Sequence, residues 1–178
     1  YVDESIPYGQ LAFTPYGLST NVPDFQNWLD GLYYWGGSEP TTAALMYSLL
    51  PENFSPTYAA DSRKIFIVIT NEEFEQGWPV GMPAPYDTAM TVDEVTDELR
   101  ADGTIVFSIM DTTYYGFGGS YDSDGDGVND GQEIAEGTGG QAFEIYDSDW
   151  SPIFNAISRT VSSQVGTSRA PVIADFCF

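Results

Sequence analysis

Histidine is absent from this sequence of 178 residues, and basic residues are scarce. Without histidine, the chain has no Ser-His-Asp or Cys-His catalytic site and no histidine-ligated zinc. Only 5 Lys and Arg residues stand against 27 Asp and Glu residues, so the formal net charge is −22. Because phosphate groups are bound through Lys and Arg, we expect neither nucleic acid nor an anionic membrane surface as a partner. Divalent cations fit this charge, and so do extracellular or high-salt surroundings.

Cysteine is almost absent too, since Cys177 is the single one and no disulfide can form within the chain. Its position allows pairing with another chain, and a small buried apolar residue is the equal alternative. No apolar run is long enough to span a bilayer, so no membrane span is expected. The sequence shows no signal peptide and begins at Tyr1 rather than Met. These features predict a processed product, a fragment or a trimmed chain.

The longest β-branched apolar run, Ile65–Ile69, is the centre of the predicted fold. A continuous run of this kind is typical of a strand buried on both faces. In an open parallel sheet, ligands bind beyond the carboxyl ends of the strands. Asn71, Glu72 and Glu73 follow the run at once and so lie where such a site would form. A core strand that ends in a solvated acidic turn is the simpler alternative.

Apolar spacing along the chain alternates between strand and helix patterns. Strands are expected at 8–14, 104–110 and 141–146, with one more at 172–178. Helices are expected at 24–32, 41–50 and 134–140. One more helix is expected to start at a capping box formed by Thr91 and Glu94. Another is expected to start at Ser151, with Ser151 as N-cap and Pro152 as its first residue. This alternation predicts an α/β fold with a doubly wound, mostly parallel sheet flanked by helices.

The strongest chemical signal is the acidic segment 122–133, DSDGDGVNDGQE. It matches a twelve-residue EF-hand-type calcium loop, with a glycine where a sharp turn is needed and oxygen donors at alternate positions. The expected ligands are Asp122, Asp124, Asp126, the carbonyl of Val128, Asp130 and the closing Glu133. Calcium takes six to eight hard oxygen ligands, which a curled loop of this kind can supply. The alternative is a flexible acidic loop that binds nothing.

The flanks of this segment are unlike those of a paired EF-hand. A Gly- and Tyr-rich stretch precedes it, and only a short helix is expected after it. The loop therefore resembles the lone calcium loops of dockerins and thrombospondin type 3 repeats. We expect a structural clamp rather than a calcium switch.

Four further stretches resemble the later part of a von Willebrand factor type A (vWA) domain. They match its Gly-Gly…Thr…Ala-Leu segment, its central strand and acidic turn, its helix-Gly-strand unit, and its Thr-Gly-Gly step into the last strand. The stretches are 36–45 (GGSEPTTAAL), 63–73 (RKIFIVITNEE), 99–109 (LRADGTIVFSI) and 134–143 (IAEGTGGQAF). The resemblance implies a vWA-like domain over 1–165 that is incomplete at its N-terminus. Within it, 111–133 is a calcium-loop insertion, and 166–178 is a C-terminal extension.

The vWA family implies a metal-ion-dependent adhesion site, usually with magnesium, built from three loops. The first carries an Asp-x-Ser-x-Ser motif, which does not occur in this sequence. Thr41 matches the Thr of the second loop, and Asn71 stands where the third supplies Asp, with Glu72 or Glu73 beside it. A helix N-cap is the alternative role for Thr41. The strand that carries the missing motif would come from an upstream segment, or the stretch 172–178 would fill its place.

Together these features predict a calcium-stabilised extracellular or cell-surface module of vWA type that binds a protein or glycan ligand. Tyr114, Tyr115, Phe117 and Tyr121 are candidate partner contacts, with packing over the loop as the alternative. A second hypothesis is a structural subunit of a surface or pilus-like assembly that pairs with its own upstream segment or a further subunit, with calcium purely structural. An enzyme is not expected, because no nucleophile elbow, phosphate loop or catalytic histidine is present.

Overall fold

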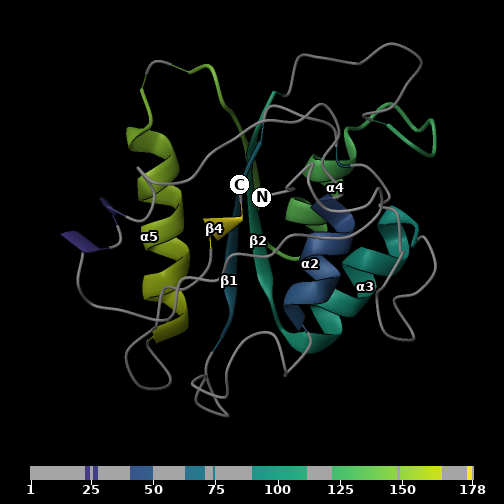
Figure 1. Cartoon of the computed structure of the whole chain (residues 1–178), viewed down its shortest axis with the longest axis horizontal. Coiled ribbons are helices and arrows are strands. Elements are labelled where there is room, and N and C mark those ends of the chain that lie inside the picture. The colour runs from purple at the N-terminus through teal and green to yellow at the C-terminus, as the bar shows by residue number, and fades with distance from the viewer. Residues whose placement is uncertain are drawn as a thin grey trace.

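The computed structural model describes residues 23–24, 26–27, 41–49, 63–70, 74, 90–111, 122–147, 149–165 and 176–177. Helices and strands alternate along this part of the chain (Figure 1). In chain order they are α2 (Thr41–Leu49), β1 (Ile65–Ile69), α3 (Val92–Asp102), β2 (Ile105–Met110), α4 (Asp130–Gly137), β3 (Gln141–Glu144), α5 (Ser151–Val165) and β4 (Phe176–Cys177). The strand expected at 8–14 and most of the helix expected at 24–32 lie outside the described residues.

The strands form one sheet in the order β3-β2-β1-β4, and all three pairings are parallel. The expected α/β class with a parallel sheet is therefore confirmed. Ile67, in the middle of β1, lies opposite Phe107 of β2 on one side and Phe176 of β4 on the other. The strand expected at 172–178 is described only at Phe176 and Cys177, which form β4 beside β1.

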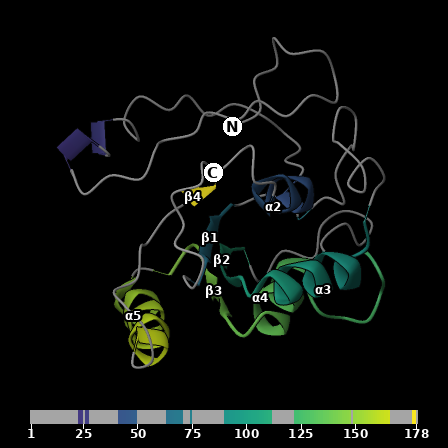
Figure 2. The same cartoon turned by 90° about the horizontal axis from the view of Figure 1, so that it is seen from below.

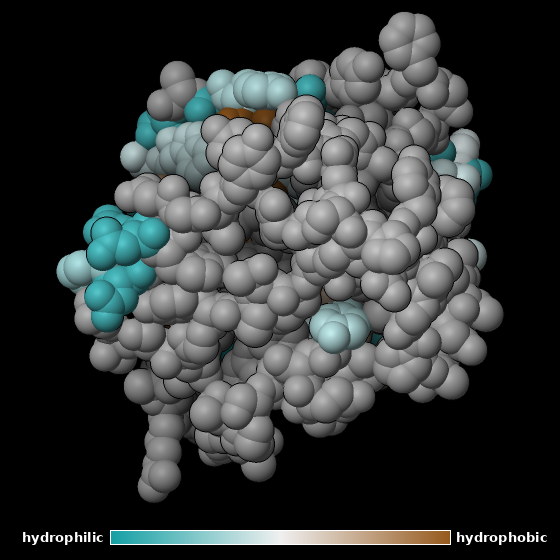
Figure 3. All heavy atoms as spheres, in the orientation of Figure 1, coloured by the Kyte–Doolittle hydropathy of each residue, from teal (hydrophilic) through white to brown (hydrophobic). Residues whose placement is uncertain are grey.

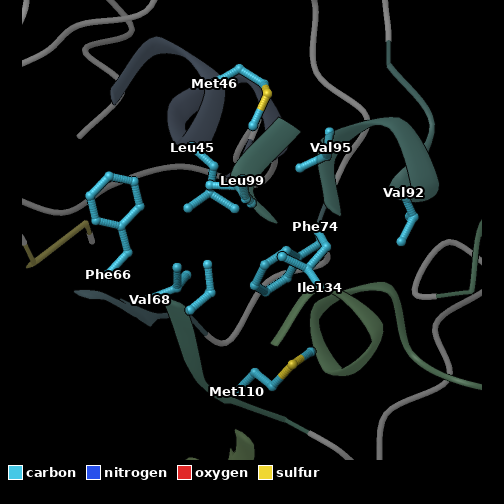
Figure 4. Close-up of a cluster of buried hydrophobic side chains, with 11 residues drawn as sticks. Leu45, Met46, Phe66, Val68, Phe74, Val92, Val95, Leu99, Met110 and Ile134 are labelled. Atoms are coloured by element: carbon cyan, nitrogen blue, oxygen red, sulfur yellow. The ribbon is translucent and has the colours of Figure 1, made fainter. Parts of the chain in front are cut away.

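Helices cover both faces of the sheet, with α2, α3 and α4 on one face and α5 on the other (Figure 2). Successive side chains of a strand point to opposite faces, so β1 and β2 each contribute to two cores. The core under α2, α3 and α4 contains Leu45, Met46, Phe66, Val68, Phe74, Val92, Val95, Leu99, Val106, Met110 and Ile134 (Figure 4). The core under α5 contains Ile65, Ile67, Ile105, Phe107, Ile109, Ile153 and Ile157. This two-sided burial explains why the strands are apolar runs rather than alternating patterns.

Helix α3 has both ends that its sequence predicts. The Thr91 hydroxyl accepts a hydrogen bond from the Glu94 amide at 3.3 Å, and the Glu94 carboxylate accepts one from the Thr91 amide at 2.8 Å. Gly103 ends the helix at φ 80°, a conformation that costs glycine little. The capping box is therefore confirmed, and it sets the start of the helix that covers β1 and β2.

Two helix starts differ from the sequence prediction. Helix α4 begins at Asp130 rather than at 134, because the Asn129 side chain accepts the Gly131 amide and acts as N-cap. Helix α5 begins at Ser151 itself, so Ser151 is not the N-cap. Its amide donates instead to the Asp149 carboxylate at 2.9 Å. In both cases a nearby Asx side chain starts the helix before the predicted residue.

A tight turn, Thr138-Gly139-Gly140, joins α4 to β3. The Thr138 hydroxyl donates to carbonyls of the last turn of α4 and accepts a hydrogen bond from the Val106 amide at 3.0 Å. Gly139 has φ 88°. A Cβ at Gly140 would overlap the Val106 carbonyl oxygen and lie 2.7 Å from its carbon. Thr-Gly-Gly thus lets the chain pass directly against β2.

Candidate metal centre

The acidic loop connects the carboxyl end of β2 to α4 and lies at the end of the sheet where the strands finish (Figure 1). The segment 122–129 is irregular backbone, and α4 begins at Asp130. The last four positions of the predicted calcium loop therefore form the first turn of a helix. This joins any ion held by the loop to an element that packs against β2.

Asp122 organises the loop through its carboxylate. One oxygen, Oδ1, accepts the amides of Gly125 at 2.7 Å and Asp126 at 3.1 Å, and Oδ2 accepts that of Gly127 at 2.9 Å. Gly125 and Gly127 have φ 81° and 92°. These left-handed conformations favour glycine and let the chain curl around the carboxylate. The sharp turn predicted at Gly127 is therefore present.

Three further carboxylates accept hydrogen bonds from backbone amides of the loop. Asp124 accepts the Asp126 amide at 3.1 Å, Asp126 accepts the Val128 amide at 2.7 Å, and Asp130 accepts the Ser123 amide at 2.8 Å. Asp122, Asp124 and Asp126 each offer an oxygen within 4.8 Å of the others. The structure thus brings together the first three predicted ligands in a geometry that could hold a metal ion.

Asp130 and Glu133 add two carboxylates from α4, outside the group of three whose oxygens lie within 4.8 Å of one another. Asp130 is fully buried at 0% exposure, and its Oδ2 has no hydrogen-bond partner among the described residues. Glu133 Oε2 is also buried and without a partner there. A buried carboxylate oxygen without a donor costs several kcal/mol unless a cation compensates it, by the order of magnitude for buried charges. Two such oxygens beside the Asp122–Asp126 cluster point to a missing positive charge.

The pKa values of the carboxyl groups indicate the same lack of positive charge. Burial, followed by repulsion from Asp126 and Asp124, raises the pKa of Glu133 to about 7. Burial also raises the pKa of Asp130, against the hydrogen bonds from Ser123. Asp122 differs: desolvation is the largest single effect and raises its pKa, but the hydrogen bonds to its carboxylate together outweigh it and lower the pKa. The Asp122 carboxyl thus favours the ionised form, whereas those of Asp130 and Glu133 on α4 resist ionisation.

The residues present fit a hard divalent cation. Carboxylate oxygens are the preferred ligands of calcium, and flexible sites with six to eight oxygens suit it better than magnesium. No Lys or Arg occurs anywhere in the stretch 101–158, so that stretch supplies no basic side chain to neutralise the cluster. The described ion pairs, Lys64 with Asp102 and Arg100 with Asp97, lie elsewhere. If an ion binds, Asp122, Asp124, Asp126, Asp130 and Glu133 would hold it, with the Val128 carbonyl as the sixth donor expected from the pattern.

Contacts between α4 and the sheet were not predicted from the sequence. The buried Ser108 hydroxyl of β2 donates to the Gly131 carbonyl at 2.9 Å. A Cβ at Gly131 would come within 2.5 Å of Phe74 and 2.6 Å of Met110. The signal in the sequence was a serine within an otherwise apolar strand and a glycine in the first turn of a helix. Together they hold the Asp130 end of α4 on β2.

The predicted adhesion site is described only at Thr41. Thr41 is the first residue of α2 and is 7% exposed, rather than a residue before the helix. The other candidates for that site and for partner contacts lie outside the described residues; they are Asn71, Glu72, Glu73, Tyr114, Tyr115, Phe117 and Tyr121. The magnesium site therefore stays a prediction.

Within the described ranges, no helix is long and apolar enough to cross a membrane. Comparisons with models of protein families, with curated proteins and with solved structures found no match. The function therefore has to be inferred from the residues and geometry of this chain.

Proposed function

We propose that this chain is a calcium-stabilised extracellular binding or adhesion module of vWA type. The observation that carries the calcium part is the pair of buried, unpartnered carboxylate oxygens on Asp130 and Glu133 beside the Asp122, Asp124 and Asp126 cluster. The charge of these five carboxylates is not balanced by any described basic side chain. A calcium ion would supply that balance.

In this proposal, calcium acts as a clamp. It neutralises the carboxylates, and because Asp130 and Glu133 belong to α4, it fixes the loop to a helix that already contacts β2 through Ser108. The neighbouring loops at the carboxyl end of the sheet are then held rigidly, in position to contact a partner. Binding of any ion to the folded state alone also raises stability by mass action.

The vWA assignment is supported by where the resembling stretches lie. Their described parts become α2, β1, the α3-Gly103-β2 unit and the Thr138-Gly139-Gly140 turn into β3. Strands β1, β2 and β3 are then neighbours in one parallel sheet, in chain order. This is the arrangement that the resemblance leads us to expect.

The alternative proposal is a structural subunit of a surface or pilus-like assembly, in which calcium only makes the loop rigid. Sedimentation of the calcium-loaded protein separates the two proposals. A discrete monomer would favour the binding module, whereas a concentration-dependent oligomer or polymer would favour the assembly subunit.

The calcium part is tested by calorimetric titration of metal-free protein, first with calcium and then with magnesium. We expect one calcium-preferring site, with affinity lost in Asp122→Ala and in Glu133→Ala. Glu98→Gln on the exposed side of α3 is the matched control, since it removes one negative charge away from the loop and should leave affinity unchanged within about twofold. Equal calcium affinity in wild type and both loop variants would overturn the assignment. A second site that accepts magnesium would support the adhesion site at Thr41.

A further inference from the structure

Two large hydrophobic side chains are exposed among the described residues, and both flank the connection from β3 to α5. Tyr146 is 68% exposed and Phe154 is 59% exposed. Between them, Trp150 is partly buried, and its ring centroid lies 6.4 Å from that of Phe154 at an interplanar angle of 42°. Trp150 and Phe154 thus form a ring pair, and Tyr146 is exposed in the connection that leads to it. Exposed aromatic side chains of this kind can mark a surface that contacts another molecule.

Two carboxylates are built into the same connection. Asp147 accepts the Asp149 amide at 3.2 Å, and Asp149 accepts the Ser151 amide at 2.9 Å. The hydrogen bonds from Ser151 lower the pKa of Asp149, so this side chain is firmly ionised. Both residues are exposed. Their positions are set by the backbone, which reduces the entropy lost when a ligand binds.

No basic side chain is described as a partner for these carboxylates. The stretch 101–158 has no Lys or Arg, and the described ion pairs use Asp97 and Asp102. Nor do Asp147 and Asp149 belong to a described group of three carboxylates close enough to hold an ion. A single metal ion therefore fits this place poorly, and an extended cationic partner fits it well.

We propose that Tyr146, Trp150 and Phe154, together with Asp147 and Asp149, bind an arginine-bearing peptide segment of a partner protein. A guanidinium plane can stack on an aromatic face while its N–H groups donate to a carboxylate, which a compact ammonium does less well. This aromatic patch combines both elements within nine consecutive residues. It deepens and rests on the proposed function, because it names the chemistry of the partner that the module would bind.

The aromatic patch and the acidic loop lie at the same end of the sheet. Both follow the carboxyl ends of strands, β3 for the patch and β2 for the loop, but α5 and α4 lie on opposite faces (Figure 1). Among the described atoms on the face shown in Figure 3, teal and pale colours predominate and brown is restricted to a small area.

The test uses a fluorescent peptide of about eight alternating Gly and Arg residues, with anisotropy measured in saturating calcium at roughly 0.15 M salt to suppress long-range attraction. We expect Phe154→Ala and Tyr146→Ala each to weaken binding about twofold to fivefold, the order of an exposed cation–π contact. Asp147→Asn should weaken it about twofold to fivefold, the upper range for an exposed ion pair. Glu98→Gln, which removes the same charge from α3, should change it less than twofold. The indole N–H signal of Trp150 should shift on binding.

Several results would overturn this proposal. One is an equal loss of affinity in Glu98→Gln and Asp147→Asn, which would mean only general attraction to an acidic protein. Another is binding of a neutral oligosaccharide, such as a glucose tetramer, that depends on Phe154 while the peptide fails to bind. A third is self-association that Phe154→Ala abolishes, which would assign the surface to a second copy of the chain. Loss of calcium binding with peptide binding intact would instead contradict only the calcium proposal.

Discussion

Replacing Asp130 with Asn should stabilise the metal-free protein and reduce the stability that calcium adds. The wild-type carboxylate is fully buried, accepts the Ser123 amide through Oδ1, and leaves Oδ2 without a described partner. Asparagine has nearly the same shape and keeps an oxygen for Ser123, but it carries no charge. In a chelator, the variant should therefore be more stable than wild type.

The magnitude follows from the buried charge. A buried polar group without a partner costs about 1–3 kcal/mol, and more when charged. We therefore expect Asp130→Asn to raise the free energy of unfolding of the metal-free protein by about 1–2 kcal/mol, since the amide is left with an unpaired N–H of its own. In calcium, wild type should gain about 2.7 kcal/mol at a hundredfold excess over Kd. A tenfold weaker affinity in the variant would reduce its gain by about 1.4 kcal/mol.

The assay is urea unfolding of both proteins, in a chelator and in calcium, followed by circular dichroism. The coupling free energy is the stability that calcium adds to wild type minus the stability that calcium adds to Asp130→Asn. Asp97→Asn is the control, because its carboxylate is exposed and pairs with Arg100 on the surface of α3. It should change stability by less than about 1 kcal/mol, equally in both conditions.

Two outcomes would refute the reasoning. If the metal-free wild type were the more stable protein, the buried carboxylate would already be compensated and the inferred missing charge would be wrong. If Asp130→Asn were more stable by the same amount in calcium as in chelator, the coupling would be zero. Asp130 would then take no part in holding the ion.

Three further predictions concern the neighbourhood of the loop. Gly140→Ala should destabilise the protein by about 3 kcal/mol or more in urea unfolding, because its Cβ would overlap the Val106 carbonyl; a loss below about 1 kcal/mol would contradict the close approach. Thr138→Val, which keeps the shape but leaves the Val106 amide without its acceptor, should cost about 1–3 kcal/mol, whereas Thr138→Ser should recover most of it. The pKa of Glu133 is raised from 4.5 to about 7, so its contribution to stability is fully present below pH 4.5 and is lost as pH rises from there to about 7. In chelator, wild type should lose stability relative to Glu133→Gln across that interval and differ from it by a constant amount above it; a difference that stays constant from pH 4.5 to 7 would show that the Glu133 pKa is not raised.

The sequence alone was sufficient for several local features, although it misplaced the starts of α4 and α5. Helix α3 begins and ends where the Thr91 capping box and Gly103 require, because capping involves residues only a few positions apart. Strand β1 was predicted with its observed bounds, and β2 within one residue, because a β-branched apolar run is stable only when both faces are buried. The curl of the acidic loop also follows from spacing, since Asp122 hydrogen-bonds to amides three to five residues later.

Tertiary structure decided the features that give the site its chemistry. Spacing names Asp130 as a ligand, but only the packing of α4 on β2 makes its carboxylate fully buried and leaves one oxygen without a donor. Likewise, Tyr146 and Phe154 are two of many aromatic residues in the sequence, and only the fold shows that their side chains are exposed. Burial depends on contacts between residues far apart in the chain, which periodicity does not encode. Charge and spacing thus predict which atoms can bind a cation, whereas the fold determines which of them lack a partner until one binds.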